Sequence, residues 1–123
     1  MVLVDTSVWV DFLRGLKGSK DLSRLLVDQQ VICHPWIIIE LALGHLGPAR
    51  RRLLNDIEQL PKLQECPSEE ILNFIEKEAL YGKGLSFVDI QLLYAAMVED
   101  HFLWTHDKHL HRAASQYAIS FIP

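Results

Sequence analysis

Short apolar runs alternate with helix-forming segments along the chain, and this alternation most constrains the fold. The strand candidates are rich in Val, Ile, Leu, Phe and Trp and span residues 2–4, 31–34, 62–66, 102–105 and 118–122, with 62–66 the weakest. The helix candidates between them span residues 5–14, 22–30, 35–46, 49–60, 67–82, 86–100 and 107–117. Such alternation is typical of a parallel sheet with helices on both faces. We therefore expect an α/β fold with about five parallel strands.

Length and composition predict one domain that spans residues 1–123. Half of the residues are hydrophobic, which is enough for one core. No apolar run approaches the ~20 residues that cross a bilayer, and MVLVDTS does not resemble a secretory signal. The only cysteines, Cys33 and Cys66, form no CxxC motif and fit a reducing compartment, although one disulfide stays open. We expect a cytoplasmic protein without a membrane partner.

Four carboxylates interrupt or end these apolar runs. Asp5 closes MVLVD, Glu40 lies within PWIIIELAL, Asp89 within SFVDIQLL, and Asp107 follows FLWTH. A carboxylate among so many apolar side chains is costly to desolvate unless it is paired or binds a cation.

Each acid also has an explanation that involves no site. Asp5 and Asp107 stand between a strand and a helix, where Asp is a favoured N-cap. Asp89 is three residues after Ser86, which matches a capping box. Glu40 has no such explanation, because its neighbours one helical turn away are apolar residues and Gly44.

The predicted topology gathers the acids. In a parallel sheet, ligands bind beyond the carboxyl ends of the strands, where Asp5, Glu40 and Asp107 all lie and which the helix of Asp89 can reach. Carboxylates that crowd together repel, and a hard cation such as Mg²⁺ or Mn²⁺ removes the repulsion. The net charge of −4 argues against broad positive potential, whereas a nuclease with a bound metal ion does not need it.

Four segments in order resemble the PIN-domain ribonucleases, in particular the VapC toxins of type II toxin–antitoxin systems. They are VLVDTSVWVDFLRG, HPWIIIELALG, GLSFVDIQLLYAA and LWTHDKHL, and together they cover nearly the whole chain. The resemblance implies a three-layer α/β/α sandwich and a Mg²⁺-dependent endoribonuclease, with Mn²⁺ as a second candidate ion. It also implies an RNA substrate, a cognate antitoxin and a homodimer.

The resemblance assigns catalytic roles to the four acids, with Asp5 and Asp89 as the principal metal ligands. Glu40 and Asp107 would orient the water, bind a second ion or act as general base. The products would carry 5′-phosphate and 3′-hydroxyl ends. Candidates for contacts with RNA are Thr6, Ser7, Thr105, Arg14, His106 and Lys108.

Two other functions fit parts of the pattern. A catalytically inactive PIN-like binding module would be expected to lack one or more of the acids, and all four are present. Another Mg²⁺-dependent phosphoesterase, of the haloacid dehalogenase type, needs a second Asp two residues after the first, where this chain has Ser7.

Overall fold

Three parallel strands form the central sheet, in the order β2-β1-β3. They are β1 (Val2–Val4), β2 (Val31–Ile32) and β3 (Phe102–Trp104), in a computed structural model that describes residues 1–123. Val2 of the central strand aligns with Val31 on one side and with Phe102 on the other. All three strands therefore end at the same edge of the sheet, and the strand order changes direction at β1, where α/β proteins bind ligands.

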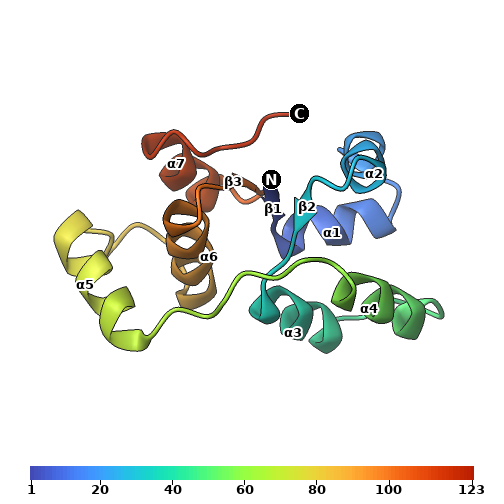
Figure 1. Ribbon diagram of the computed structural model, residues 1–123, viewed down its shortest axis with the longest axis horizontal. Helices are drawn as coiled ribbons and strands as arrows, with labels where there is room; N and C mark the ends of the chain where they lie inside the picture. Colours follow the sequence, from blue (N-terminus) through green and yellow to red (C-terminus); the bar gives the residue numbers. More distant parts are fainter.

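Seven helices cover the sheet on both faces. They are α1 (Thr6–Leu13), α2 (Ser19–Val27), α3 (Pro35–Leu43), α4 (Arg50–Glu58), α5 (Ser68–Glu78), α6 (Phe87–Val98) and α7 (Lys108–Gln116). Figure 1 shows α1 to α4 on one side of the strands and α5 to α7 on the other. The α/β fold with a parallel sheet between two helical layers, as the sequence predicts, is confirmed.

The predicted number of about five strands is wrong, because the two outer segments pair at one residue each. Lys62 forms an isolated parallel bridge with Cys33, and Ser120 forms one with Leu103. Pro61 has no N–H to extend the first of these pairings. The last segment begins with Ala118 at a φ of 57°, a left-handed turn that leaves little room for a strand. Both segments lie beside the outer strands of the sheet, but their pairing is too short to form strands.

The core lies between the sheet and its two helical layers. Every side chain of β1 is buried, which explains why this strand is a continuous apolar run rather than an alternating one. The helix α6 buries residues 90–93, 95 and 96, and it packs against β3. No helix in the structure combines the length and apolar character that a membrane span requires. Cys33 and Cys66 are both free thiols.

His34 is fully buried and begins the helix that carries Glu40. Its Nδ1 accepts a hydrogen bond of 3.1 Å from the backbone N–H of Trp36, so its proton is on Nε2, which has no partner. Burial lowers the pKa of His34 below its ordinary value of 6.5, and the charge of Glu65 opposes that shift only in part. The helix cap therefore depends on a neutral imidazole.

We predict that the free energy of unfolding falls as the pH drops below 6.5. In that range the unfolded chain binds a proton that folded His34 does not, which costs up to about 1.4 kcal/mol per pH unit. Replacing His34 with Asn keeps a capping side chain but removes the titration. Urea unfolding at several pH values should show a smaller slope for His34→Asn; an unchanged slope would contradict the prediction. Burial also lowers the pKa of His101. The free energy of unfolding of His34→Asn should therefore keep a smaller dependence on pH.

Candidate functional site

Asp5 lies at the carboxyl end of the central strand and is almost completely buried. Its backbone N–H donates to Trp104 O, which continues the pairing of β1 with β3 past the last strand residue. Its carboxylate accepts three bonds, from Thr6 N at 2.8 Å, Ser7 Oγ at 2.8 Å and Thr105 Oγ1 at 2.7 Å. These donors come from both sides of the sheet edge and hold the carboxylate in one orientation.

Glu40 joins this network from the second turn of α3. Thr6 Oγ1 donates to Glu40 Oε1 at 2.7 Å, while Oε2 makes no hydrogen bond. Burial raises the pKa of Glu40, and the charges of Asp5 and Asp89 raise it further, against the bond from Thr6. The sequence shows no polar helix face around Glu40. The structure gives the reason, because the carboxylate is held at the sheet edge by Thr6 and does not face solvent from a polar stripe.

Asp107 is the N-cap of α7 and Asp89 is the third residue of α6, and both also contribute charge to this edge. Asp89 Oδ2 accepts from Ser86 N and Ser86 Oγ accepts from Asp89 N, which completes the predicted capping box. Asp107 Oδ1 accepts from Leu110 N at the start of α7. Burial raises the pKa of Asp89, and the charges of Asp5 and Asp107 add to the shift. The capping roles and the shared site predicted for these acids are therefore compatible.

The acidic cluster, by which we mean Asp5, Glu40, Asp89 and Asp107, has no cation paired with it. No Lys or Arg pairs with a carboxylate anywhere in the structure, and His106 lies against Asp11, which is outside the cluster. Glu40 Oε2, Asp89 Oδ1 and Asp107 Oδ2 make no hydrogen bond to the protein. Oxygen donors and uncompensated negative charge are what Mg²⁺ and Mn²⁺ prefer.

The carboxylates of the cluster do not form a closed metal cage. No three His, Cys, Asp or Glu side chains converge closely enough to hold one ion together. Mg²⁺ usually keeps several waters and needs only one or two protein carboxylates, so this spacing suits a hydrated ion. The cluster therefore fits a divalent ion in charge and in donor type.

Three of the residues predicted to contact RNA belong to the hydrogen-bond network of Asp5. Thr6 bridges Asp5 and Glu40, while Ser7 and Thr105 both donate to Asp5 Oδ2. Thr105 Oγ1 also accepts from Asp107 N at 3.0 Å, which links the last acid to the first.

His106 lies beside this network, and its ring is held by Asp11, a residue that the sequence analysis missed. The His106 backbone N–H donates to Ser7 Oγ at 3.0 Å, and its Nδ1 lies 2.6 Å from Asp11 Oδ2. Asp11 follows Ser7 by one helical turn, so their shared face of α1 was the available signal.

Arg14 and Lys108 lie farther from the Asp5 network. Arg14 lines a cavity of about 320 Å³ together with Thr6 and Glu40, and forms no ion pair with Glu40. Lys108 is exposed at the first position of α7 and has no carboxylate partner either. Both cations are accessible at the rim of the cluster.

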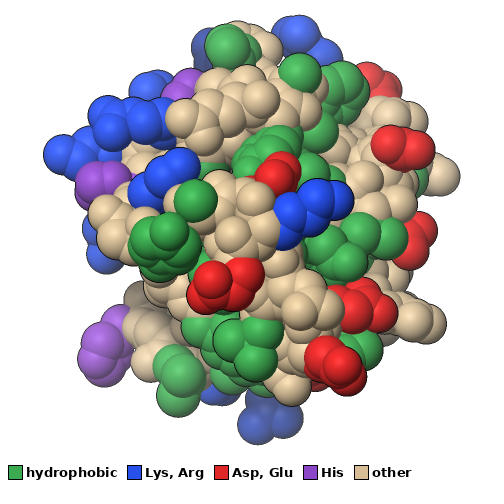
Figure 2. All heavy atoms as spheres, turned by 90° about the vertical axis from the view of Figure 1, so that its left-hand side faces the viewer, with side chains coloured by type: hydrophobic (Ala, Val, Ile, Leu, Met, Phe, Trp, Pro, Cys, Tyr) green, Lys and Arg blue, Asp and Glu red, His purple; other side chains and the backbone are tan.

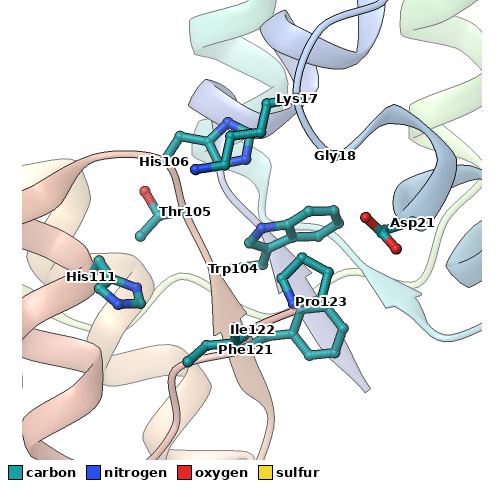
Figure 3. A pocket seen from close by; sticks show the side chains of 10 residues that line it. All are labelled: Lys17, Gly18, Asp21, Trp104, Thr105, His106, His111, Phe121, Ile122 and Pro123. Atoms are coloured by element: carbon teal, nitrogen blue, oxygen red, sulfur yellow. The ribbon is translucent and has the colours of Figure 1, made fainter.

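The largest cavity, about 450 Å³, contains none of the four acids but adjoins them through Thr105 and His106. Figure 3 shows Lys17 and His106 at one end of this cavity, Trp104 at its centre and Asp21 across from them. Since Trp104 is only 2% exposed, its ring is part of the core rather than an open stacking surface. The cavity is an extension of the acidic edge with mixed charge.

Comparison with known proteins gives a match over nearly the whole chain. The chain is 37% identical over 121 residues to the ribonuclease VapC32 of Mycobacterium tuberculosis strain H37Rv, which covers 98% of this chain and 95% of that protein. The ribonuclease VapC32 of strain CDC 1551 gives the same identity and coverage. No family model matches the chain.

We predict that neutralising the most strongly coupled acids stabilises the protein. With divalent ions absent, Glu40→Gln and Asp89→Asn should each raise the free energy of unfolding at neutral pH by roughly 0.5–1 kcal/mol, or a few degrees in Tm. The raised pKa values of both groups mean that their ionisation opposes folding, and solvent screening keeps the effect small. Thermal melts in EDTA measure the change, with exposed Asp28→Asn as the matched control.

Addition of Mg²⁺ or Mn²⁺ to the same melts tests the cluster as a cation site. The parent should gain stability with ion concentration, and Asp89→Asn should gain less. Equal gains in the two proteins would count against a cation at this cluster.

Proposed function

The chain belongs to the VapC ribonuclease family, and from that premise we propose that it is a metal-dependent endoribonuclease, the toxin of a toxin–antitoxin pair. The observation that carries the proposal is the acidic cluster itself. Four carboxylates influence one another at one sheet edge, two of them with raised pKa values, and no cation pairs with any of them. The mutual repulsion of crowded carboxylates opposes folding, and such crowding is typical of a site kept for its chemistry.

Asp5 and Asp89 would hold the ion, Mg²⁺ or Mn²⁺. Asp5 is the best-oriented carboxylate of the cluster because three donors fix it, and Asp89 has a free Oδ1 on a carboxylate that the capping box with Ser86 fixes. When bound, a divalent ion supplies Lewis acidity, which neutralises charge on a phosphate and makes a nearby water more acidic.

Glu40 is the residue we assign to proton transfer. A general base works best when its pKa lies near the working pH, and burial with two neighbouring charges moves the pKa of Glu40 in that direction. The bond from Thr6 holds Oε1, so Oε2 is the atom that would take the proton of the attacking water. Asp107, fixed by Leu110 N–H and by Thr105, would orient that water from the α7 side.

The side chains at the rim would position the RNA. Arg14 shares a cavity with Glu40, Lys108 adjoins Asp107, and His106 is held near Ser7 by Asp11. Arg14 and Lys108 can each approach a phosphate oxygen without a carboxylate contact to break first. Together they offset the repulsion between the acids and an anionic substrate.

We predict that Asp5→Asn abolishes RNA cleavage while the fold stays intact. The amide keeps an acceptor for Thr105 but loses the charge that an ion requires, so the rate should fall by at least about 100-fold. Cleavage of labelled RNA in Mg²⁺ or Mn²⁺, with circular dichroism for the fold, measures this. Asp28→Asn, an exposed acid outside the cluster, should cut at the parent's rate. Parental activity in Asp5→Asn would rule the assignment out.

The helix α3 exposes an apolar face to solvent. We assign this face to the contact between the two chains of a homodimer. Ile39 and Leu43 lie four residues apart on the same face, and they are 55% and 83% exposed. An antitoxin would cover apolar surface elsewhere, for example the groove lined by Trp9, Phe12 and Leu53. A helical segment with apolar residues at helical spacing would fit such a groove.

We predict that replacing both Ile39 and Leu43 with Glu converts a dimer to a monomer, because buried unpaired charges oppose association. Light scattering after size exclusion measures the mass of each protein. Val27→Glu on α2, where Val27 is 81% exposed, is the matched control and should remain dimeric. A parent chain that elutes as a monomer at high concentration would contradict the dimer.

A further inference from the structure

A basic pocket lies between the Gly82–Leu85 loop and α7. Its volume is about 410 Å³, and we call it the Lys83–Arg112 pocket. Polar groups reach it from Lys83, His109, Arg112 and Gln116, and no carboxylate lines it. In a chain of 16 acidic and 12 basic residues, a cavity with two cations and no acid is unusual.

Neither cation of this pocket is used by the fold. Lys83 and Arg112 form no ion pair and no side-chain hydrogen bond, and both are exposed. Figure 2 shows the face formed by α5 to α7, where Lys, Arg and His gather along one edge and Asp and Glu along the opposite edge. Unpaired cations that share a cavity attract an anion, and a guanidinium binds phosphate with two parallel bonds.

One wall of the pocket is formed where the backbone of Gly84 contacts the ring of His109. Gly84 has a φ of 75°, and a Cβ at this position would lie 3.1 Å from His109 Nδ1. The loop therefore packs directly on the imidazole, as only Gly allows. Lys83 lies in the chain between Gly84 and Gly82, which also has a positive φ of 70°.

Neighbours along the chain connect the pocket with the acidic cluster on both of its sides. Leu85, in its loop, precedes Ser86, whose N–H donates to Asp89 Oδ2. His109, on its other side, is in the first turn of α7, two residues after Asp107. The pocket is therefore lined by the loop that leads to Asp89 and by the helix that Asp107 caps.

The larger cavity of Figure 3 is a weaker anion site. It contains Lys17 and two histidines, but the Asp21 carboxylate faces the same space. A carboxylate repels phosphate and offsets the nearby cation, whereas the Lys83–Arg112 pocket has no such group.

We propose that the Lys83–Arg112 pocket binds a backbone phosphate of single-stranded RNA, next to the phosphate at which the chain is cut. The inference rests on the proposed function and adds a second anchor for the same strand. A contact with a phosphate adds affinity without reading the base, so the pocket sets the path of the strand and not its sequence.

The test is RNA binding in the Asp5→Asn background, measured by fluorescence anisotropy with a short labelled single-stranded RNA over a range of salt at constant Mg²⁺. The double variant Lys83→Ala/Arg112→Ala should raise Kd about tenfold and reduce the slope of log Kd against log salt by about 0.7, the value of one single-strand phosphate. Arg51→Ala/Arg52→Ala removes the same charge from exposed positions on α4 and should leave both quantities unchanged. Lys83→Arg/Arg112→Lys, which keeps the charges, should bind within a few-fold of the background.

Two results would contradict phosphate binding at this pocket. One is an unchanged Kd and salt slope in Lys83→Ala/Arg112→Ala, and the other is an equal loss of RNA affinity in the α4 control. Cleavage assays separate this failure from failure of the proposed function. If the parent cuts RNA and the pocket variant binds normally, only the pocket is wrong. If the parent binds RNA through the pocket but does not cut it in Mg²⁺ or Mn²⁺, the pocket stands and the nuclease assignment falls.

Discussion

The hydrogen bond of 2.7 Å from Thr105 to Asp5 is the contact on which the rest of the site depends. It joins the residue that follows β3 to the residue that follows β1, directly beyond the last backbone pair of these strands. The same Thr105 hydroxyl accepts from Asp107 N, and the same Asp5 carboxylate accepts from the first turn of α1. One buried threonine therefore sets the relative positions of two strands, two helices and two acids.

Helix capping explains how the fold tolerates so much negative charge in one place. Asp5 and Asp107 are the N-caps of α1 and α7, and Asp89 closes the capping box of α6 from its third position, so three helix N-termini meet at the acidic cluster. The partial positive charge at these N-termini offsets carboxylate charge, by about 0.3–1 kcal/mol for each accessible pair. Glu40 is not a cap and lies two turns into its helix; its pKa is raised. Glu40 is thus the one acid of the cluster whose position helix capping does not explain.

Sequence reasoning located the acids because each lies at an element boundary that local chemistry determines. Asp5 and Asp107 follow apolar runs, and Asp89 follows Ser86 at capping-box spacing, so their placement depends on the order of elements more than on packing. The prediction of five strands was wrong because composition does not determine pairing. Residues 118–122 have a strand-like composition, but a left-handed turn at Ala118 limits their pairing with the sheet. Asp11, His34 and the Lys83–Arg112 pocket were missed for a different reason. Their surroundings come from residues far apart in the chain, as in the contact of Asp11 with His106, and no short pattern encodes such contacts.

The acidic cluster and the basic pocket lie apart from each other, and the needs of RNA binding explain this separation of negative from positive charge. An acidic cluster that binds a cation repels RNA when the ion is absent, and it attracts only the phosphate next to the ion when it is present. The rest of the strand then needs its own positive groups, placed close enough to share the strand and far enough away not to pair with the acids. Lys83 and Arg112 meet both conditions: their pocket adjoins Ser86 and α7, yet neither residue forms an ion pair. A net charge of −4 is therefore compatible with RNA as the ligand, because the distribution of charge along this edge, and not its sum, determines where a strand can lie.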